Sequence, residues 1–436
     1  TLGWPNNKEL DFQKWYPNSV LVTGFDIIFF WVARMTMMGL TLTEEMPFED
    51  VYIHGLVRDE NNKKMSKSSG NGIDPLLLID KYGSDALRFA LVREVAGSGQ
   101  DIRLDFDRKK QTSSTVEASR NFANKLWNAT KFVMLNVPSN INNSTFELDL
   151  NDLELPDKWI LSKLNKLNNN VFQLLIDYKL GEAAKLLYEF TWNDFCDWYV
   201  EFLKPRFNNP EDKRKYIAHK LLIKVLNDIL IMINPFMPHV TEELWHALNR
   251  EFSSNQFLSK GKWPELNRDF LDNDLENSFN KFFEVIRLIR NLRTELDLKP
   301  SQKINLYIIS NNQSTLDFLN SLVHSISNFT KASEINILKG NQINKVHFAK
   351  CFSGIIEDIE VLLPFEGLIN LDSLKDRLSK DLAKVVNEIE ILNKRMSNKN
   401  FIDKAPQDVV SECNKKLSIA ISKEKAINKK LALISE

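Results

Sequence analysis

Residues 61–74 read NNKKMSKSSGNGID, a loop-like segment that sets lysines among serines and glycines between two mostly apolar stretches. Lys64 and Lys67 are three positions apart in it, so one loop could present two cations to the same anionic ligand. Positioned cations stabilise the charge that spreads over phosphate oxygens during displacement at phosphorus. A plain solvated loop has the same composition, so the flanking segments must decide between these interpretations.

The flanking segments predict a strand, a helix and a second strand. Residues 19–24 (SVLVTG) and 51–57 (VYIHGLV) are β-branched runs, and residues 26–40 between them have the length and apolar content of a helix. This is the size of a βαβ unit, whose strands are parallel and whose ligands bind beyond the carboxyl ends of the strands. The residues expected at that edge are Gly24, Asp26, His54 and Gly55, followed by the lysine loop.

From about residue 112 the pattern changes to long helical segments broken by prolines, including Pro205. The predicted helices cover residues 113–136, 157–177, 181–202, 214–233, 239–249 and 275–296. They indicate an all-α bundle. Short β-type runs return between residues 303 and 363 around a helical stretch, which predicts a small α/β module.

The last segment carries a heptad-like seam. Apolar residues recur at alternating spacings of three and four from Leu371 to Met396 and again from Val410 to Ile434. Such a seam predicts two coiled-coil helices, and SNKNFIDKAP between them predicts the turn of an antiparallel hairpin. The lysines of the second helix lie off the seam, and by charge pattern alone they favour a merely solvated face.

Composition bounds the class of protein. With 43% apolar and 26% charged residues and a net charge of −1, the chain is globular and has no overall basic excess. Its cysteines, Cys196, Cys351 and Cys413, are too far apart for a zinc knuckle or a disulfide framework. The longest apolar run is interrupted by Arg34, so we expect a buried helix there and no membrane partner.

Several stretches, in this order, resemble the second half of a class I aminoacyl-tRNA synthetase, and most closely the valyl branch. The resemblance runs over Thr1–Glu436. Separate matches in the right order are far more specific than one short motif. The stretches are YPNSVLVTGFDIIFFWVARMTMMG, VYIHGLVRDENNKKMSKSSGNGIDP, YGSDALRFAL, RNFANKLWNATKFV, INPFMPHVTEELW and MSNKNFIDKAP.

The resemblance implies valine–tRNA ligase activity, in which ATP activates valine before transfer to tRNA(Val). It further implies ATP with Mg²⁺, no resident metal site, a monomer and a cytoplasmic location. The fold it implies is multidomain, α/β plus all-α. The expected domains are the C-terminal part of a Rossmann-like catalytic domain over 1–111, a helical anticodon-binding domain over 112–300, a small α/β connecting module over 301–367 and a coiled-coil tRNA-binding arm over 368–436.

Site residues carry over from the resemblance at matching positions. Lys64 and Lys67 would be catalytic, with Met65, Ser66 and Ser68 shaping their loop. Gly24, Asp26, His54 and Gly55 would contact the nucleotide, and Trp31 would wall the amino-acid pocket. Ordinary structural roles stand beside these assignments: a helix N-cap for Asp26, the core for Trp31 and a structural strand end for His54.

The resemblance also implies two sets of tRNA contacts. Arg120, Asn124 and Lys125, with Asn128 and Lys131, recur on one helical spacing that could face phosphate, and Phe122 could stack on an anticodon base. Trp127 and Phe132 are expected in the core. In the hairpin, the candidates are Lys415, Lys416, Lys423 and Lys430, which would lie along the tRNA elbow.

The family's HIGH signature and its editing domain do not occur in this sequence. We therefore expect a C-terminal portion of the enzyme that is inactive alone. Three alternatives remain at this point: a non-catalytic tRNA-binding fragment, another class I synthetase of isoleucyl or leucyl type, and a helical scaffold built on the coiled coil.

Overall fold

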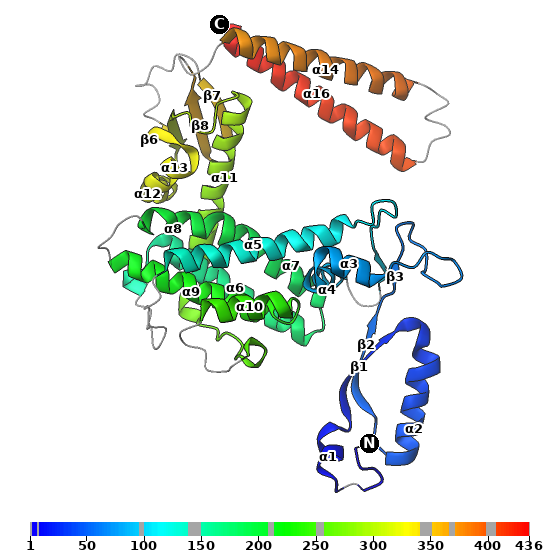
Figure 1. The fold of residues 1–436 in the computed structure, drawn as a ribbon. Coiled ribbons are helices and arrows are strands. Elements are labelled where there is room, and N and C mark those ends of the chain that lie inside the picture. The colour runs from blue at the N-terminus through cyan, green and yellow to red at the C-terminus, as the bar shows by residue number, and fades with distance from the viewer. Residues whose placement is uncertain are drawn as a thin grey trace. The chain divides into compact units, whose positions relative to one another are not determined.

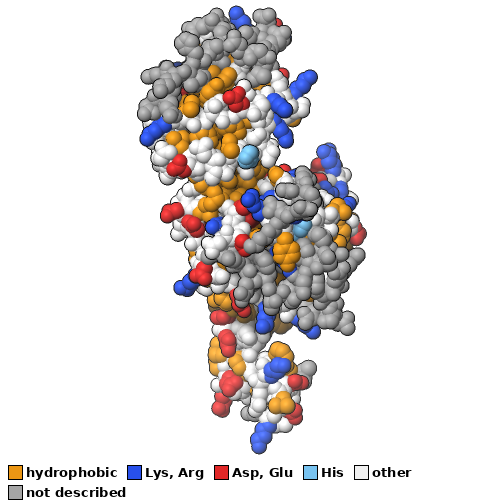
Figure 2. Space-filling model, turned by 90° about the vertical axis from the view of Figure 1, so that its left-hand side faces the viewer, with side chains coloured by type: hydrophobic (Ala, Val, Ile, Leu, Met, Phe, Trp, Pro, Cys, Tyr) orange, Lys and Arg blue, Asp and Glu red, His pale blue; other side chains and the backbone are white. Residues whose placement is uncertain are grey.

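The structure is a computed structural model that describes residues 2–6, 8–95, 100–137, 150–207, 213–249, 257–340, 351–365, 371–397 and 407–435. The chain folds into two compact units, Thr1–Glu276 and Asn277–Glu436. On the face shown in Figure 2, basic and acidic side chains are interspersed, in keeping with the net charge of −1.

The first unit begins with the predicted parallel strand pair. After α1 (Leu10–Trp15), β1 (Asn18–Gly24) pairs with β2 (Phe48–His54) in a register that sets Gly24 beside His54. The connection is a 3₁₀ turn (Phe25–Ile27), a π-helical turn (Ile28–Val32) and then α2 (Ala33–Thr43). Both strands therefore end at the same edge, as the sequence predicts.

The prediction that this connection is a buried helix is wrong for the described residues. Only 6% of the apolar window within Phe25–Thr43 is buried, and by length and composition this segment could cross a bilayer. The physical reason is the size of the sheet beneath it, because two strands cannot cover both sides of a helix. Figure 1 shows α2 beside β1 and β2 with no further layer drawn over it.

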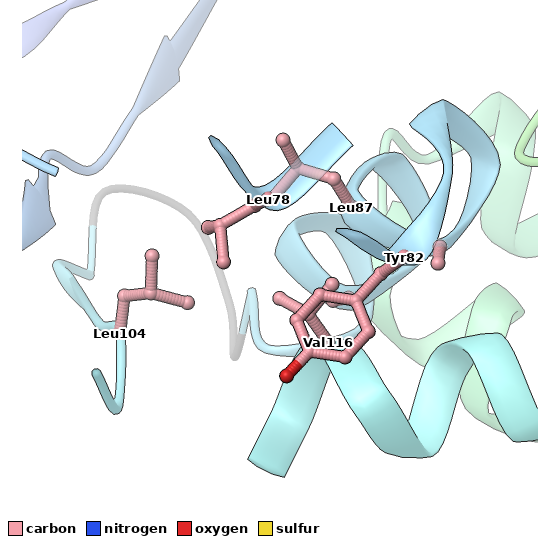
Figure 3. Close-up of a cluster of buried hydrophobic side chains, with 7 residues drawn as sticks. Leu78, Tyr82, Leu87, Leu104 and Val116 are labelled. Atoms are coloured by element: carbon pink, nitrogen blue, oxygen red, sulfur yellow. The ribbon is translucent and has the colours of Figure 1, made fainter. Parts of the chain in front are cut away.

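A second parallel pair, β3 (Val57–Arg58) with β4 (Ile102–Arg103), follows the first. Between them lie α3 (Pro75–Tyr82) and α4 (Ser84–Arg93). Asp74 caps α3 through a bond from the Leu76 amide, and Pro75 occupies the first turn, where its missing N–H costs nothing. Figure 3 shows the core of this region, in which Leu78, Tyr82 and Leu87 meet Leu104 and Val116.

The helical bundle completes the first unit. Its helices are α5 (Ser114–Asn136), α6 (Leu155–Ile176), α7 (Leu180–Glu189), a π-helix (Phe190–Tyr199), α8 (Val200–Phe207), α9 (Lys213–Ile233) and α10 (Pro238–Leu248), with short 3₁₀ turns at Leu150–Asp152, Leu258–Lys260 and Arg268–Phe270. The predicted break at Pro205 is wrong, since α8 continues to Phe207. Pro205 lies in the last turn, so few helix bonds depend on it.

A buried ion network joins α6 to the π-helix and to α8. Asp157, fully buried in α6, accepts hydrogen bonds from Tyr199 (3.0 Å) and Arg206 (2.8 Å). Glu154 and Asp157 also form the capping box of α6. A buried carboxylate with this many partners is stabilised, whereas removing a partner would leave it uncompensated.

The second unit begins within α11 (Asn273–Glu295), which leads to a four-stranded sheet of order β6-β5-β8-β7. The strands are β5 (Ile304–Ser310), β6 (Ala332–Lys339), β7 (Cys351–Ile356) and β8 (Ile359–Pro364), and α12 (Gln313–Ser321) and α13 (Val323–Thr330) connect the parallel pair β5 and β6. The small α/β module is present, and β7 was not predicted.

The chain ends in two helices, α14 (Leu371–Ser397) and α16 (Gln407–Ser435), which pack along each other (Figure 1). Leu392, Cys413 and Ala420 are buried between them, with Ile389, Met396 and Leu417 packed against this cluster. These are seam residues of the predicted pattern. The supercoil itself stays a prediction, and most of the predicted turn, residues 398–406, lies outside the described residues.

Candidate functional site

The carboxyl edge of β1 and β2 brings the predicted nucleotide-facing residues together. Gly24 and His54 are neighbours in the register, and Asp26 follows in the 3₁₀ turn. The His54 Nδ1 lies 2.8 Å from the Gly55 carbonyl oxygen. A Cβ at Gly55 would lie 1.8 Å from the Gln100 carbonyl oxygen, so only glycine allows this approach of two backbones.

The lysine loop reaches this edge through one ion pair. The Lys64 Nζ lies 3.0 Å from the Asp26 Oδ2, although the two residues are 38 positions apart. The side chain of Lys64 is 61% exposed, so the pair is open to solvent. Lys67 is exposed as well. Both cations are thus accessible to solvent, and Lys64 lies at the carboxyl edge.

The tip of the loop is organised by hydroxyl groups. The Ser66 Oγ lies 3.1 Å from the Ser68 Oγ and 2.7 Å from the Ser69 Oγ, and it accepts a bond from the Ser69 amide. Gly70 has φ +62°, a conformation that glycine adopts at little cost. Met65 is half-buried. The tip is a tight turn held by its own side chains.

The base of the loop is a second turn centred on Asp59, a buried residue that is 2% exposed. The Asp59 carboxylate accepts hydrogen bonds from the Lys63 amide (2.7 Å) and the Asn61 amide (3.0 Å). The bond from Lys63 and the bond from the Asn71 side chain lower the pKa of Asp59 below its ordinary value. Asp59 therefore stays ionised and fixes the loop base.

Asn71 closes the loop, and sequence reasoning missed it. Its side chain bonds to Asp59, to the Ser66 amide and to the Lys64 carbonyl oxygen. Its own carbonyl oxygen accepts a bond of 2.7 Å from Arg108. The available signal was an asparagine between two glycines, four positions after Lys67, a combination that favours side-chain bonds to a turn.

Two further ion pairs frame the loop. Arg108 donates to both carboxylate oxygens of Glu60 (2.6 and 3.2 Å), which lowers the pKa of Glu60. Asp101 accepts from the Leu56 amide at 2.8 Å and pairs with Arg58, and these bonds, in that order, lower the pKa of Asp101. Arg58 and Lys64 are bridged through their backbones. The frame ties the loop to β3 and β4.

Trp31 does not line a pocket within the described residues, because its side chain is 61% exposed on the π-helical turn. A cavity of about 660 Å³ does exist elsewhere in the first unit. It lies along β2 and the start of α7, where Tyr178 donates to Asp50 (2.9 Å). The lysine loop does not line this cavity, which is therefore separate from the candidate site.

The prediction that Phe122 stacks on a nucleobase is wrong in this structure. Phe122 is fully buried in α5, with its ring centroid 5.0 Å from that of Phe89 and 4.9 Å from that of Tyr188. Trp127, expected in the core, is instead 47% exposed, and Phe132 is half-buried. The buried stripe of α5 runs through Val116, Ser119, Phe122, Leu126, Ala129 and Val133, and Trp127 falls off it.

Two basic candidates on α5, Arg120 and Lys125, already have protein partners. The Lys125 Nζ lies 2.5 Å from an Asp197 carboxylate oxygen and 3.9 Å from the centre of the Trp192 ring. Arg120 pairs with Glu117 (3.1 Å) and lies over the Tyr82 ring. Asn124 is exposed. Any phosphate contact by the two cations would compete with these pairs.

The hairpin lysines lie on α16. Lys415, Lys416 and Lys423 are exposed, and Lys416 pairs with Glu412 one turn away (2.8 Å), which raises the pKa of Lys416. The side chain of Lys430 lies outside the described part of the structure. Exposure along one helix makes these lysines accessible to an extended anion.

Three family models match the chain. The model for tRNA synthetases class I (I, L, M and V) matches residues 1–105, and that for the anticodon-binding domain of tRNA ligase matches residues 157–308. The model for the valyl tRNA synthetase tRNA binding arm matches residues 370–435. These matches fall on the strand edge with its lysine loop, on the helical bundle and on the terminal helix pair, respectively.

The chain is also similar to curated proteins. It is 65% identical over 434 residues to a valine–tRNA ligase of Prochlorococcus marinus subsp. pastoris, covering 100% of this chain and 47% of that protein. It is 46% identical over 442 residues to the valine–tRNA ligase of a Synechocystis strain, covering 100% of this chain and 48% of that protein. The chain thus spans about half the length of these relatives.

Among solved structures, a methionyl-tRNA synthetase of Mycobacterium tuberculosis in complex with methionyl-adenylate aligns with 56% of this chain and 47% of its own. The identity is 20% and the TM-score 0.45, a likeness too low to bear on function.

Proposed function

We propose, from the premise that this chain belongs to the valine–tRNA ligase family, that it supplies the lysine loop and the tRNA-binding part of a valine–tRNA ligase. The observation that carries the proposal is the meeting of Lys64 with Asp26 at the carboxyl edge of β1, where an α/β sheet binds nucleotides. Similarity to valine–tRNA ligases over the full chain length selects the reaction.

In the proposed reaction the valine carboxylate attacks the α-phosphate of ATP, and the bond to the β-phosphate breaks as pyrophosphate leaves. Lys64 and Lys67 would stabilise the negative charge that grows on the phosphate oxygens. Mg²⁺ bound with ATP would neutralise part of the same charge. Gly24 would leave room for the nucleotide, and the His54 ring and the Gly55 backbone would contact it. Asp26 would accept from the ribose hydroxyls or the valine amine.

The ion pair between Lys64 and Asp26 is compatible with the separate substrate contacts proposed for the two residues. An exposed ion pair is weak, so a polyphosphate can take Lys64 from Asp26 at little cost. Release of Lys64 at the same time frees the Asp26 carboxylate for its own substrate contact. Binding of ATP would therefore change the partners of both residues together.

The exposed face of Phe25–Thr43 has a place in the same proposal. A surface this apolar is normally covered in a folded protein, and relatives are about twice as long as this chain. We assign its cover to the remainder of the catalytic domain, which would also complete the valine pocket around Trp31. This explains why Trp31 is exposed here without discarding its proposed role.

Transfer to tRNA(Val) is the second proposed step, with the bundle near the anticodon and the α14–α16 pair on a distant part of the tRNA. Each arm helix of ~27 residues extends about 40 Å at 1.5 Å per residue, which suits such a reach. The lysines of this helix pair would contact phosphate and so add affinity without reading sequence; they are Lys415, Lys416, Lys423 and Lys430.

We further propose that the protein is a cytoplasmic monomer without a membrane partner.

Pyrophosphate exchange tests the proposal. The complete protein should incorporate labelled pyrophosphate into ATP with valine, and far more slowly with isoleucine, leucine or methionine. The 436-residue chain alone should bind tRNA without exchange, because residues opposite the lysines are missing. Exchange by the complete protein with isoleucine or leucine but not valine would favour another class I synthetase, and tRNA binding without any exchange would favour a non-catalytic binding protein.

A further inference from the structure

We propose that Asn71 is a positioning residue that fixes where Lys64 and Lys67 leave the loop base, with Asp59 as its anchor. This inference rests on the proposed function, because the lysines matter only if the loop meets a phosphate. The contacts themselves belong to this chain and can be tested with or without catalysis.

The amide of Asn71 bridges the backbone on both sides of Met65. Its Oδ1 accepts a hydrogen bond from the Ser66 amide (3.0 Å), and its Nδ2 donates to the Lys64 carbonyl oxygen (3.2 Å). Lys64 is therefore held through its own carbonyl group, and Lys67 follows one residue after the held Ser66. One side chain sets the starting points of both cations.

Asp59 anchors this bridge from below. The Asn71 Nδ2 donates to the Asp59 Oδ2 at 2.9 Å, while the other Asp59 oxygen is held by the Lys63 and Asn61 amides. Because Asp59 is buried and keeps a lowered pKa, it presents a permanent acceptor to Asn71. Arg108 holds the Asn71 backbone from the other side, at 2.7 Å.

The chemistry of the bridge requires an asparagine. It needs one acceptor for the Ser66 amide and one donor for Asp59 and Lys64 on a side chain of this length. Alanine offers neither, and an ionised aspartate offers no donor. The base of the loop is thereby fixed while its tip, Ser68 to Gly70, stays exposed and able to move over a ligand.

The first test measures pyrophosphate exchange in the complete protein with single variants of Asn71 and with a double variant that swaps Asp59 and Asn71. Asn71→Ala and Asn71→Asp should each lower kcat for valine-dependent pyrophosphate exchange by about 10- to 100-fold, the effect of unsatisfied buried partners, with KM for valine unchanged. The double variant Asp59→Asn/Asn71→Asp reverses the bond between the two side chains and keeps the Ser66 contact, and it loses only the donor to the Lys64 carbonyl oxygen. It should recover to within about 10-fold of wild type.

Asn61→Ala is the matched control. Asn61 is an exposed asparagine of the same loop, and its backbone amide, which the substitution keeps, makes its contact with Asp59. This control should exchange at the wild-type rate. If Asn71→Ala also exchanged at that rate, the positioning role would be overturned, and the same result would follow if the double variant were no better than its singles.

A pH profile adds a readout that a general loss of packing would not move. In Asn71→Asp the introduced carboxyl faces Asp59 directly, and the charged groups beside this pair are Arg108, which bonds to the carbonyl oxygen of residue 71, and its partner Glu60. Two carboxyl groups this close hold a shared proton more readily as the pH falls, and the protonated group can donate again. The activity of Asn71→Asp relative to wild type should rise from pH 8 to pH 6, and a flat ratio would contradict the proposed bond.

Hydrogen exchange of the 436-residue chain separates this inference from the proposed function. Asn71→Ala should lose amide protection in the peptide that contains residues 61–70, whereas peptides of α5 and α6 should match wild type. If Asn71→Ala loses amide protection but the complete protein shows no pyrophosphate exchange, the Asn71 bridge exists and the proposed function fails. Unchanged amide protection would contradict the proposed Asn71 bridge even if the complete protein is active.

Discussion

The Lys64 ammonium lies 3.0 Å from the Asp26 carboxylate, so the lysine loop is joined to the edge of β1 by an exposed ion pair. Exposed pairs contribute about 0.2–1 kcal/mol, and Asp26→Asn should therefore lower the free energy of unfolding of the chain by less than about 1 kcal/mol. In the complete protein the same variant should raise KM for ATP or valine by about 10-fold or more. Urea unfolding and exchange kinetics check the two expectations, and a destabilisation above about 2 kcal/mol would make Asp26 a structural residue.

Replacing Phe122 should cost far more stability than replacing Trp127. Phe122→Ala opens a cavity in a fully buried position and should cost about 3–5 kcal/mol of unfolding free energy. Trp127→Ala, at a position 47% exposed, should cost less than about 1 kcal/mol. Urea denaturation of the two variants measures these losses. Equal small losses of unfolding free energy would show that Phe122 is not buried.

Asp105 should make the start of α5 sensitive to acid. Burial raises its pKa, but hydrogen bonds from Ser114, Thr115 and Ser113 outweigh burial and lower the pKa to about 2. A depressed pKa stabilises the fold above the unfolded value near 3.8, and this stabilisation is lost as the pH falls from about 4 to 2. Asp105 is only partly buried, so solvent screening keeps the contribution to at most about 2 kcal/mol.

The measurement is the unfolding free energy of wild type and Asp105→Asn between pH 6 and 2. The difference between the two proteins should shrink on acidification, because the amide of the variant does not titrate. A difference that stays constant across this range would show that folding does not shift the pKa of Asp105.

The arm lysines should produce salt-dependent tRNA affinity. Replacing Lys415, Lys416, Lys423 and Lys430 with glutamine should weaken tRNA binding and reduce the slope of log affinity against log salt by about 2 to 3, since each phosphate contact contributes somewhat less than one. The matched control replaces the exposed lysines Lys8, Lys14, Lys260 and Lys299, which removes the same charge outside the arm. Equal slopes in the two variants, with helicity retained, would leave the arm lysines as a solvated face.

Local sequence patterns predicted the helices and strands better than they predicted which of these elements are buried. The β-branched runs at residues 19–24 and 51–57 led to β1 and β2, and the apolar seam led to α14 and α16. The strand β7 was missed because Cys351–Ile356 is short and interrupted by Gly354. The apolar content of Phe25–Thr43 suggested burial, but what covers a helix depends on segments distant in sequence.

The site was predictable in part. KMSKS marked the loop, yet the Asn71 bridge depends on Asp59 and Asn71, which are twelve positions apart, and on Arg108, 37 positions beyond Asn71. No local period encodes such a network. Phe122 is a different case, because its spacing with Leu126 and Val133 already indicated the buried stripe, and the family resemblance was followed instead.

The most direct test of the account is valine-dependent pyrophosphate exchange by the complete protein with Lys67→Ala. Removing one preorganised transition-state contact should slow exchange by about 10²- to 10³-fold while tRNA affinity stays nearly constant. Lys63→Ala, an exposed lysine of the same loop outside the proposed pair, should exchange like wild type. Wild-type exchange by Lys67→Ala would contradict the claim that this loop stabilises the reacting phosphate.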